Sequence, residues 1–319
     1  MRMNAQAHPR TITIRGRKVG TTEVFDTFWR FAARRQAMFM RRVAGHAPPW
    51  TDDSVLGSHR FTNVYRASDR VSQYLIRNVI YDGPTVAEEV YFRVILFKLF
   101  NRIETWEALS AAVGSPRWRG FKFERYAKTL DELMAHGSRV YSAAYIMPSP
   151  RMGSPRKHRN HLRLLESMMH NGAPRAVSNA RSLSDVFAVL RSYPSIGDFL
   201  AFQFAIDLNY SELLDFSEME FVVAGPGARD GIRKCFGGTP LPDVDIIRAM
   251  AERADSEFGR LGLSFDTLWG RPLQLIDCQN LFCEVSKYAR LVHPTVKGIS
   301  ERTRIKQKFL PSHRLIPQW

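Results

Sequence analysis

The sequence predicts an all-α, mainly helical fold with few short strands. Its 319 residues are 45% hydrophobic and 24% charged, an ordinary globular composition that excludes disorder over most of the chain. Apolar residues recur at helical spacing in many short segments, and alternating strand–helix units are missing. No apolar run reaches the length of a membrane span, and the N-terminal MRMNAQAHPR lacks the apolar core of a signal peptide. We therefore expect a cytoplasmic protein.

The elements follow from the apolar spacing and from the Pro and Gly residues between them. Residues 1–20 predict a basic arm that includes a short edge strand, TITIRGRKV. Residues 21–295 predict one helical domain, with a mobile loop at 147–157 (MPSPRMGSPRK), and residues 296–319 a basic tail. The predicted helices span residues 22–43, 68–80, 85–103, 105–113, 121–136, 158–169, 184–190, 198–208, 228–235, 244–260 and 275–291.

The chain carries 46 Lys and Arg against 31 Asp and Glu, a net charge of +15. Such a surplus favours a polyanionic partner, because each cation that neutralises a phosphate releases a counterion. A soluble basic protein without a nucleic-acid role and a membrane surface are the alternatives. The basic clusters are scattered along the chain, which favours double-stranded DNA over a membrane. One cluster supplies Arg156 and Lys157 as expected contacts to the DNA backbone.

Three cysteines, Cys235, Cys278 and Cys283, are too few for a disulfide framework or a four-Cys metal site. We interpret them as buried small hydrophobic residues. We expect no metal, no cofactor and a monomer.

The segment SYPSIGDFLA at 192–201 has the pattern of a helix-hairpin-helix motif. Its turn, Ser195, Ile196 and Gly197, would offer backbone N–H groups to a DNA phosphate. An ordinary corner between two helices explains the pattern equally well. Downstream, Gly225-Pro-Gly227 opens a helix that carries Arg229 and could bind a second phosphate, although a tight turn with close helix packing is the alternative.

Two polar clusters are candidates for a base-binding pocket. The spacing of Asn63, Arg66 and Arg70 places them on one helical face, with Phe61 and Asp69 beside them. A polar stripe on an otherwise apolar helix must be satisfied by partners or line a cavity. On the predicted helix 275–291 this stripe comprises Asp277, Asn280, Glu284 and Lys287, and Gln279 is its neighbour. The alternative for the first cluster is a structural Arg–Asp network.

The helix-hairpin-helix pattern resembles that of a superfamily of DNA glycosylases. In those enzymes a catalytic carboxylate follows the hairpin glycine by about twenty residues, which here implies Glu218 or Glu220, with Asp277 as a further candidate. A carboxylate suits the reaction because it stabilises the positive charge that develops on the sugar. Phe199 stands where the lytic members carry a Lys, so the resemblance implies a monofunctional enzyme. Acidic residues at a solvated helix start are the alternative.

Four segments together resemble a known family: FTNVYRASDR, YPSIGDFLAFQFAIDLNYS, FVVAGPGARDGIRKCF and LIDCQNLFCEVSKYAR. The chain, from Thr22 to Arg290, is similar to the α-glutamyl/putrescinyl thymine pyrophosphorylase family, also described as the helical domain of 5-hydroxymethyldeoxyuridine (5-hmdU) DNA kinases. The resemblance implies a role in thymine hypermodification in phage DNA. Some stand-alone members are similar to an antiphage DNA glycosylase that removes α-glucosylated 5-hydroxymethylcytosine.

Three hypotheses follow. The first, which we favour at this stage, is a monofunctional glycosylase that flips a hypermodified base, reads it with Phe61, Asn63 and Arg66, and leaves an abasic site as phage defence. The second is a transferase or pyrophosphorylase that replaces the pyrophosphate of an activated 5-hydroxymethyluracil in DNA, with Arg66, Arg70 and Arg229 holding the diphosphate. The third, a non-catalytic DNA-binding module, is disfavoured because phosphate binding alone needs no interior polar stripe.

Overall fold

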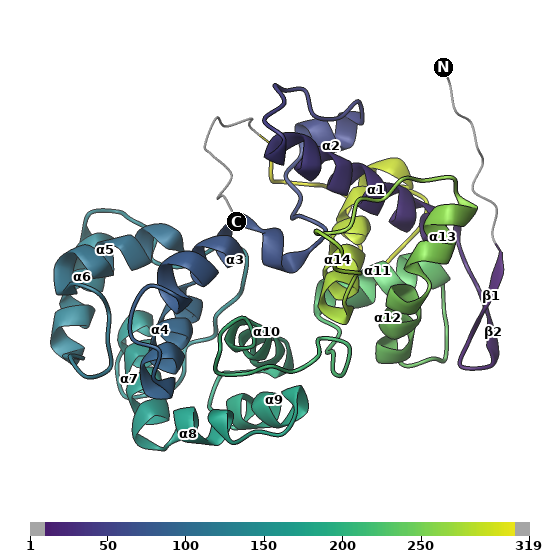
Figure 1. Cartoon of the computed structure of the whole chain (residues 1–319). Helices are drawn as coiled ribbons and strands as arrows, with labels where there is room; N and C mark the ends of the chain where they lie inside the picture. The colour runs from purple at the N-terminus through teal and green to yellow at the C-terminus, as the bar shows by residue number, and fades with distance from the viewer. Residues whose placement is uncertain (1–9, 310–319) are drawn as a thin grey trace. The chain divides into compact units, whose positions relative to one another are not determined.

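The computed structural model describes residues 10–309 and is mainly helical, which confirms the predicted fold class (Figure 1). Within these residues it contains 14 α-helices and one two-stranded hairpin. Residues 1–9 of the predicted arm and 310–319 of the predicted tail lie outside the described residues. No helix in the described part of the chain is long and apolar enough to cross a membrane.

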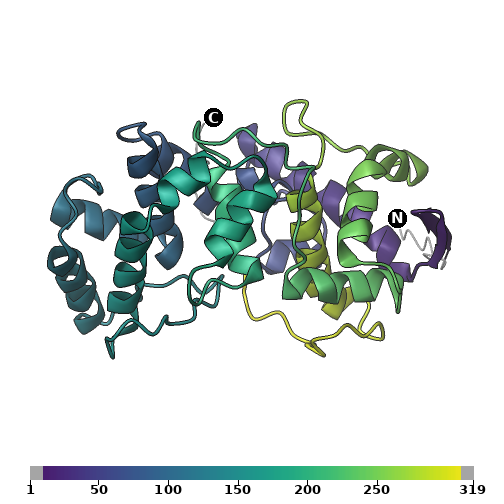
Figure 2. The same cartoon turned by 90° about the horizontal axis from the view of Figure 1, so that it is seen from below.

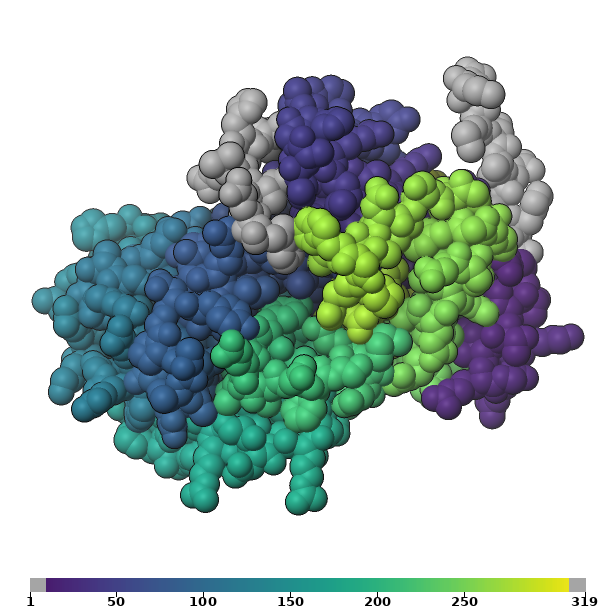
Figure 3. Space-filling view, in the orientation of Figure 1, coloured from purple at the N-terminus to yellow at the C-terminus, as the bar shows by residue number. Residues whose placement is uncertain are grey.

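The chain forms two compact units. The first, here called the terminal unit, combines both ends of the chain, Met1–Asp69 and Val222–Trp319. The second, the middle unit, is Arg70–Phe221. Figure 3 shows the early and late parts of the terminal unit in direct contact, and backbone hydrogen bonds from Arg60 N to Gln307 O and from Phe309 N to Ser58 O join them at 3.0 Å.

The terminal unit begins with an antiparallel hairpin, β1 (Thr11–Ile14) and β2 (Arg17–Gly20), in which Ile14 pairs with Arg17. Arg15 and Gly16 both have positive φ (50° and 73°), as a tight two-residue hairpin turn requires. The rest of this unit is helical. Its helices are α1 (Glu23–Val43), α2 (Ser54–Ser58), α11 (Pro226–Phe236), α12 (Asp243–Glu252), α13 (Ala254–Arg260) and α14 (Leu275–Val292), with a 3₁₀ turn at Arg66–Ser68.

Helix α14 is the centre of this unit, and α1, α11 and α12 all pack against it (Figure 2). The approach of α11 to α14 requires glycine. A Cβ atom at Gly231 would lie 2.0 Å from the carbonyl oxygen of Phe282, and one at Gly227 would lie 2.3 Å from the sulfur of Cys283. The ring centres of Phe28 in α1 and Phe282 in α14 lie 4.8 Å apart. Helices α1, α11 and α14 therefore share one apolar core.

The middle unit is entirely helical apart from its connections. Its elements are α3 (Arg70–Leu75), a π-helical turn (Ile76–Ile80), α4 (Ala87–Phe100), α5 (Ile103–Val113), α6 (Phe123–Ala135), α7 (Lys157–His170), α8 (Ala173–Ser178), α9 (Leu183–Arg191) and α10 (Asp198–Leu208). Helix α4 is buried on nearly every side, and α7, α8 and α10 surround it. Lys98, the cation within its apolar run, forms a buried ion pair with Asp207 of α10 at 3.0 Å.

Residues 147–156 lead into α7 without regular structure, whereas Lys157, the last residue of the predicted loop, is the first residue of α7. The backbone of residues 147–156 is bonded to α7 at several points. Arg163 donates to Met152 O at 2.6 Å, and the side chain of Asn160 both accepts from Ser154 N at 2.9 Å and donates to Ser154 O at 2.8 Å.

Candidate functional site

The polar stripe of α14 faces one loop of the terminal unit, residues 61–69. The predicted shared face of Asp277, Asn280, Glu284 and Lys287 is confirmed, because the first three bind this loop and Lys287 bonds Glu284 and lies over the ring of Phe61. Gln279 is also buried in α14. The stripe and the loop together form the polar cluster that the sequence predicts as a base pocket.

Asp277 is 2% exposed and binds backbone donors with both carboxylate oxygens. Its Oδ1 accepts from Arg66 N at 2.8 Å, and its Oδ2 accepts from Gln274 N at 3.0 Å as part of a capping box at the start of α14. The carboxylate therefore fixes the loop and the helix end at once.

Glu284 and Asn280 hold the earlier part of the loop. Glu284 Oε2 accepts from Thr62 N at 3.0 Å and from Lys287 Nζ at 2.8 Å. Asn280 Nδ2 donates to Thr62 Oγ1 at 3.0 Å and to the carbonyl of Asn63 at 3.2 Å. Each buried polar group named here thus has a partner, and the loop backbone is fixed by side chains rather than by secondary structure.

This loop is not the helix that the spacing of Asn63, Arg66 and Arg70 predicts. Regular helix begins only at Arg70, in the middle unit, and the three residues do not share a helical face. The reason is that side chains bind the backbone N–H and C=O groups that a helix would use for its own hydrogen bonds. Asn63 Nδ2 donates to Ser68 O at 2.8 Å, while the carboxylates of α14 bind the N–H groups of Thr62 and Arg66.

Arg35 of α1 is a member of this cluster that sequence reasoning missed. It is buried, its Nε donates to Thr62 O at 3.0 Å, and a second bond reaches the side chain of Asn63. Burial lowers the pKa of this guanidinium to about 10. The sequence does show an Arg among the apolar positions of α1, which indicates a buried cation. It does not show the partners of this Arg, because they lie outside that helix.

Asp69 completes the cluster. Its Oδ1 accepts from Asn63 N at 2.7 Å. Burial raises the pKa of this carboxyl to about 6, although the bond from Asn63 and the charge of Arg35 oppose the rise. The cluster thus contains one acid whose charge changes near neutral pH.

The carboxylates expected from the hairpin spacing lie in the middle unit, whereas Asp277 lies in the terminal unit. Glu218 is buried and Glu220 is exposed, and both occupy the irregular stretch that follows α10. They are not at a helix start, so the structural alternative considered for them is wrong. Their catalytic role stays a prediction.

Helices α9 and α10 pack against each other and are joined by residues 192–197, whose assignment to a helix-hairpin-helix motif stays a prediction. Ser195 has a positive φ of 64°, and Ile196 is buried. Gly197 precedes α10, and within residues 10–309 no side chain caps this helix. Asp198 forms an ion pair with Arg191, so its carboxylate is directed to a cation.

The Gly225-Pro-Gly227 segment opens α11 as predicted. The close contact of Gly227 with Cys283 supports the packing explanation for this glycine. Arg229 is largely exposed and forms an ion pair with Asp243 at 3.4 Å.

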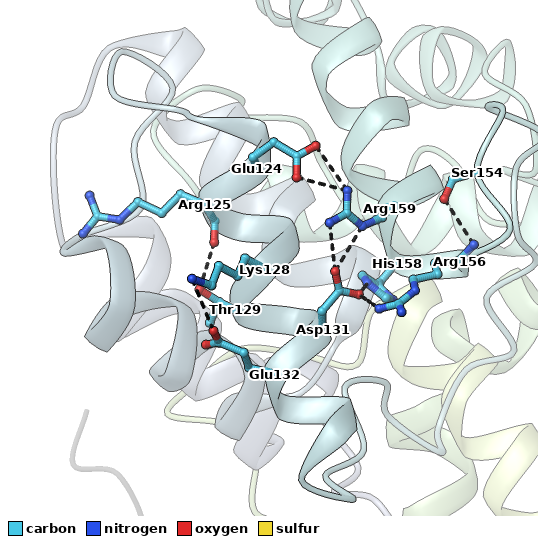
Figure 4. Close-up of polar contacts among 10 residues, drawn as sticks. All are labelled: Glu124, Arg125, Lys128, Thr129, Asp131, Glu132, Ser154, Arg156, His158 and Arg159. Carbon is cyan, nitrogen blue, oxygen red and sulfur yellow. Dashed lines mark hydrogen bonds and ion pairs between the residues drawn. The ribbon is translucent and has the colours of Figure 1, made fainter.

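The basic segment at the start of α7, residues 156–159, is partly neutralised (Figure 4). Asp131 of α6 accepts from Arg156, from His158 Nε2 at 2.7 Å and from Arg159 Nη2 at 2.9 Å. Burial would raise the pKa of Asp131, but these three bonds outweigh it and lower the pKa to about 2. Lys157 Nζ lies 4.3 Å from the centre of the Tyr141 ring. Arg156 and Lys157 are thus engaged within the unit.

Comparison with known proteins identifies the family. Residues 22–298 match the family described as 5-hmdU DNA kinase, helical domain. The chain belongs to this family. The resemblance predicted from the four sequence segments is therefore confirmed at the level of the family.

A curated relative is the 5-hmdU DNA kinase of Bacillus phage SP10, which is 26% identical over 286 residues. The match covers 83% of this chain and 45% of the relative, so the chain spans less than half of that protein's length. No solved structure matches the chain significantly.

These findings correct the activity that we favoured from the sequence. The expected hydrolytic DNA glycosylase is wrong, because both the family and the phage relative are named for a DNA kinase, which is a transferase.

Proposed function

We propose that this chain is a group-transfer enzyme that acts on activated 5-hydroxymethyluracil in DNA. The observation that carries the proposal is the family match over residues 22–298, together with a phage relative named for phosphorylating 5-hmdU in DNA. A phosphorylated hydroxymethyl group is an activated leaving group, so an enzyme that uses it is a chemically consistent companion of such a kinase.

The reaction balances simply. An amine or a water molecule forms a bond to the 5-methylene carbon, and the carbon–oxygen bond to the diphosphate breaks. The electron pair leaves with pyrophosphate, and the proton of the nucleophile passes to solvent or to a nearby base. The enzyme must hold the DNA, position the base and stabilise the charge on the leaving group.

The chain offers groups for each task. Its net charge of +15 suits a DNA substrate, and the uncapped start of α10 after Gly197 suits a backbone phosphate. Loop 61–69 offers Arg66 as a contact to the base, while the side chain of Asn63 bonds Ser68 and Arg35 and holds the loop in shape. Arg70 and Arg229, both exposed, are the proposed cations for DNA or diphosphate oxygens.

The proposal is tested with three duplex oligonucleotides that contain thymine, 5-hydroxymethyluracil or its diphosphate ester. After incubation with and without putrescine, digestion and mass spectrometry identify the nucleosides, and a coupled assay measures pyrophosphate. We expect pyrophosphate release and a changed base on an intact sugar, only from the diphosphate ester. Free base or an unchanged ester would contradict the proposal.

A matched pair of variants tests the diphosphate contact. Arg229→Gln removes an exposed cation at the start of α11, and Arg233→Gln removes another one turn further along. We expect the first to slow pyrophosphate release about tenfold, the effect of one lost charge-assisted bond, and the second to leave it unchanged. Equal effects would remove Arg229 from the reaction.

A further inference from the structure

A small cavity of about 30 Å³ opens in the terminal unit beyond the C-terminal end of α14. Four cations line it and only one acid does: Lys234, Arg290, Lys297 and Arg302 against Glu301. His293 also lines it, but its ring already binds Glu23 at 3.0 Å. One water needs about 10 to 15 Å³ of such space, so the cavity has room for about two oxygens of a phosphoryl group whose other oxygens face the opening.

The wall of this cavity is held in place by Asp230 of α11. The N–H of Ser300 donates to Asp230 Oδ1 at 2.7 Å, and the hydroxyl of Ser286 in α14 donates to Oδ2. A Cβ atom at Gly298 would lie 2.3 Å from Oδ1, so the chain passes directly over this carboxylate. The segment that carries Lys297 and Arg302 is thereby fixed against α11 and α14.

Acids match the cations Lys234 and Arg290 only weakly, since the ion pair of Lys234 with Asp230 is long. Lys234 is 3% exposed and donates to Ser286 O at 2.8 Å, but Asp230 lies 3.6 Å from it and already accepts from Ser286 and Ser300. Arg290 donates to the backbone oxygen of Arg304 at 3.2 Å, while its buried Nε has no hydrogen-bond partner within residues 10–309.

Mutual repulsion adds to this imbalance. Burial lowers the pKa of Arg290, the charge of Asp230 opposes this decrease, and the charge of Arg302 adds to it. Burial also lowers the pKa of Lys234; Asp230 opposes that decrease and Arg290 contributes to it. The carbonyl groups at the end of α14 attract cations and account for the bond from Lys297 Nζ to Pro294 O at 3.4 Å. They do not account for a buried guanidinium N–H without a partner.

We propose that this cavity binds a phosphoryl group, with Arg290 and Arg302 as its principal donors and Lys234 and Lys297 as supporting charges. An arginine pair presents several N–H groups to tetrahedral oxygens, and an anion would relieve the repulsion between the cations. The occupant is either a phosphate of the DNA backbone or a free or base-linked diphosphate. Only the assignment to the leaving diphosphate rests on the proposed function; phosphate binding itself does not.

The test uses two substitutions that remove the same charge from the full chain. Arg302→Gln removes an exposed side chain that lines the cavity, and Arg304→Gln removes an exposed side chain that does not. Calorimetry measures the affinity of the wild-type chain and of both variants for inorganic phosphate and for pyrophosphate. We expect Arg302→Gln to weaken binding about tenfold and Arg304→Gln to weaken it less than about twofold. Unchanged melting temperatures would verify that both variants are folded.

Competition with an unmodified duplex then distinguishes the two sources. If the duplex displaces pyrophosphate, a backbone phosphate occupies the cavity; if both bind together, the site takes a free or base-linked diphosphate. The proposal is overturned if the wild-type chain binds neither anion up to about 10 mM. It is equally overturned if the two substitutions weaken binding alike. Either result leaves the transfer reaction itself open to its own assay.

Discussion

Asp69, in the polar cluster between loop 61–69 and α14, is expected to make the stability of the protein depend on pH. The raised pKa of about 6 means that this carboxyl is ionised at pH 7.5 at a cost to the folded state. Asp69→Asn keeps an oxygen that can accept from Asn63 N, and it removes the buried charge. The pKa of Asp69 lies about two pKa units above its ordinary value, which corresponds to about 3 kcal/mol of free energy. We therefore expect Asp69→Asn to raise the free energy of unfolding by about 1 to 3 kcal/mol at pH 7.5.

The sign follows from linkage. Below the ordinary pKa of 3.8 the carboxyl is protonated in both states and costs nothing. Between that value and about 6 the unfolded chain loses the proton first, so wild-type stability falls and then stays lower. Urea denaturation of both proteins from pH 4 to pH 8 should show the advantage of Asp69→Asn growing up to pH 6 and remaining constant above it. A less stable variant at pH 7.5 would show that attraction to Arg35 outweighs burial, against our reasoning.

Three further substitutions test the packing and the ion network. Asp131→Asn should cost about 1 kcal/mol at neutral pH, because water screens this network, and the loss should disappear as the pH falls through 3.8 toward 2; denaturation across that range measures it. Gly231→Ala should lower the melting temperature and cost about 3 kcal/mol, since the new methyl group meets the carbonyl of Phe282, whereas Gly259→Ala, with open space, should not. Asp277→Ala should cost about 2 kcal/mol by urea denaturation, and a normal midpoint would show that its two backbone bonds are dispensable.

Much of the helical fold is predictable from local patterns. Val24, Phe28 and Phe31 recur at helical spacing, and α1 forms over nearly the expected residues. Gly225-Pro-Gly227 opens a helix because Pro fits the first helical turn, and it does so in the structure. These features depend on neighbours within a few residues, which the sequence displays directly.

The candidate site is less predictable because its partners are distant in sequence. The stripe from Asp277 to Lys287 is evident in the sequence, but the loop that it binds lies more than 200 residues earlier. Spacing alone therefore predicts Asn63 and Arg66 on one helix, whereas the α14 carboxylates bind the loop backbone and only a 3₁₀ turn forms at Arg66. The partnership of Lys234 with the segment after α14 was not visible for the same reason.

Tracing ¹⁸O from labelled water tests the central claim most directly. The assay uses a duplex with the diphosphate ester of 5-hydroxymethyluracil and no amine, and mass spectrometry locates the label. Attack at the 5-methylene carbon predicts ¹⁸O in the hydroxymethyl group of the base and none in the released pyrophosphate. Label at the sugar C1′ or in phosphate would show cleavage of a different bond and would contradict the account.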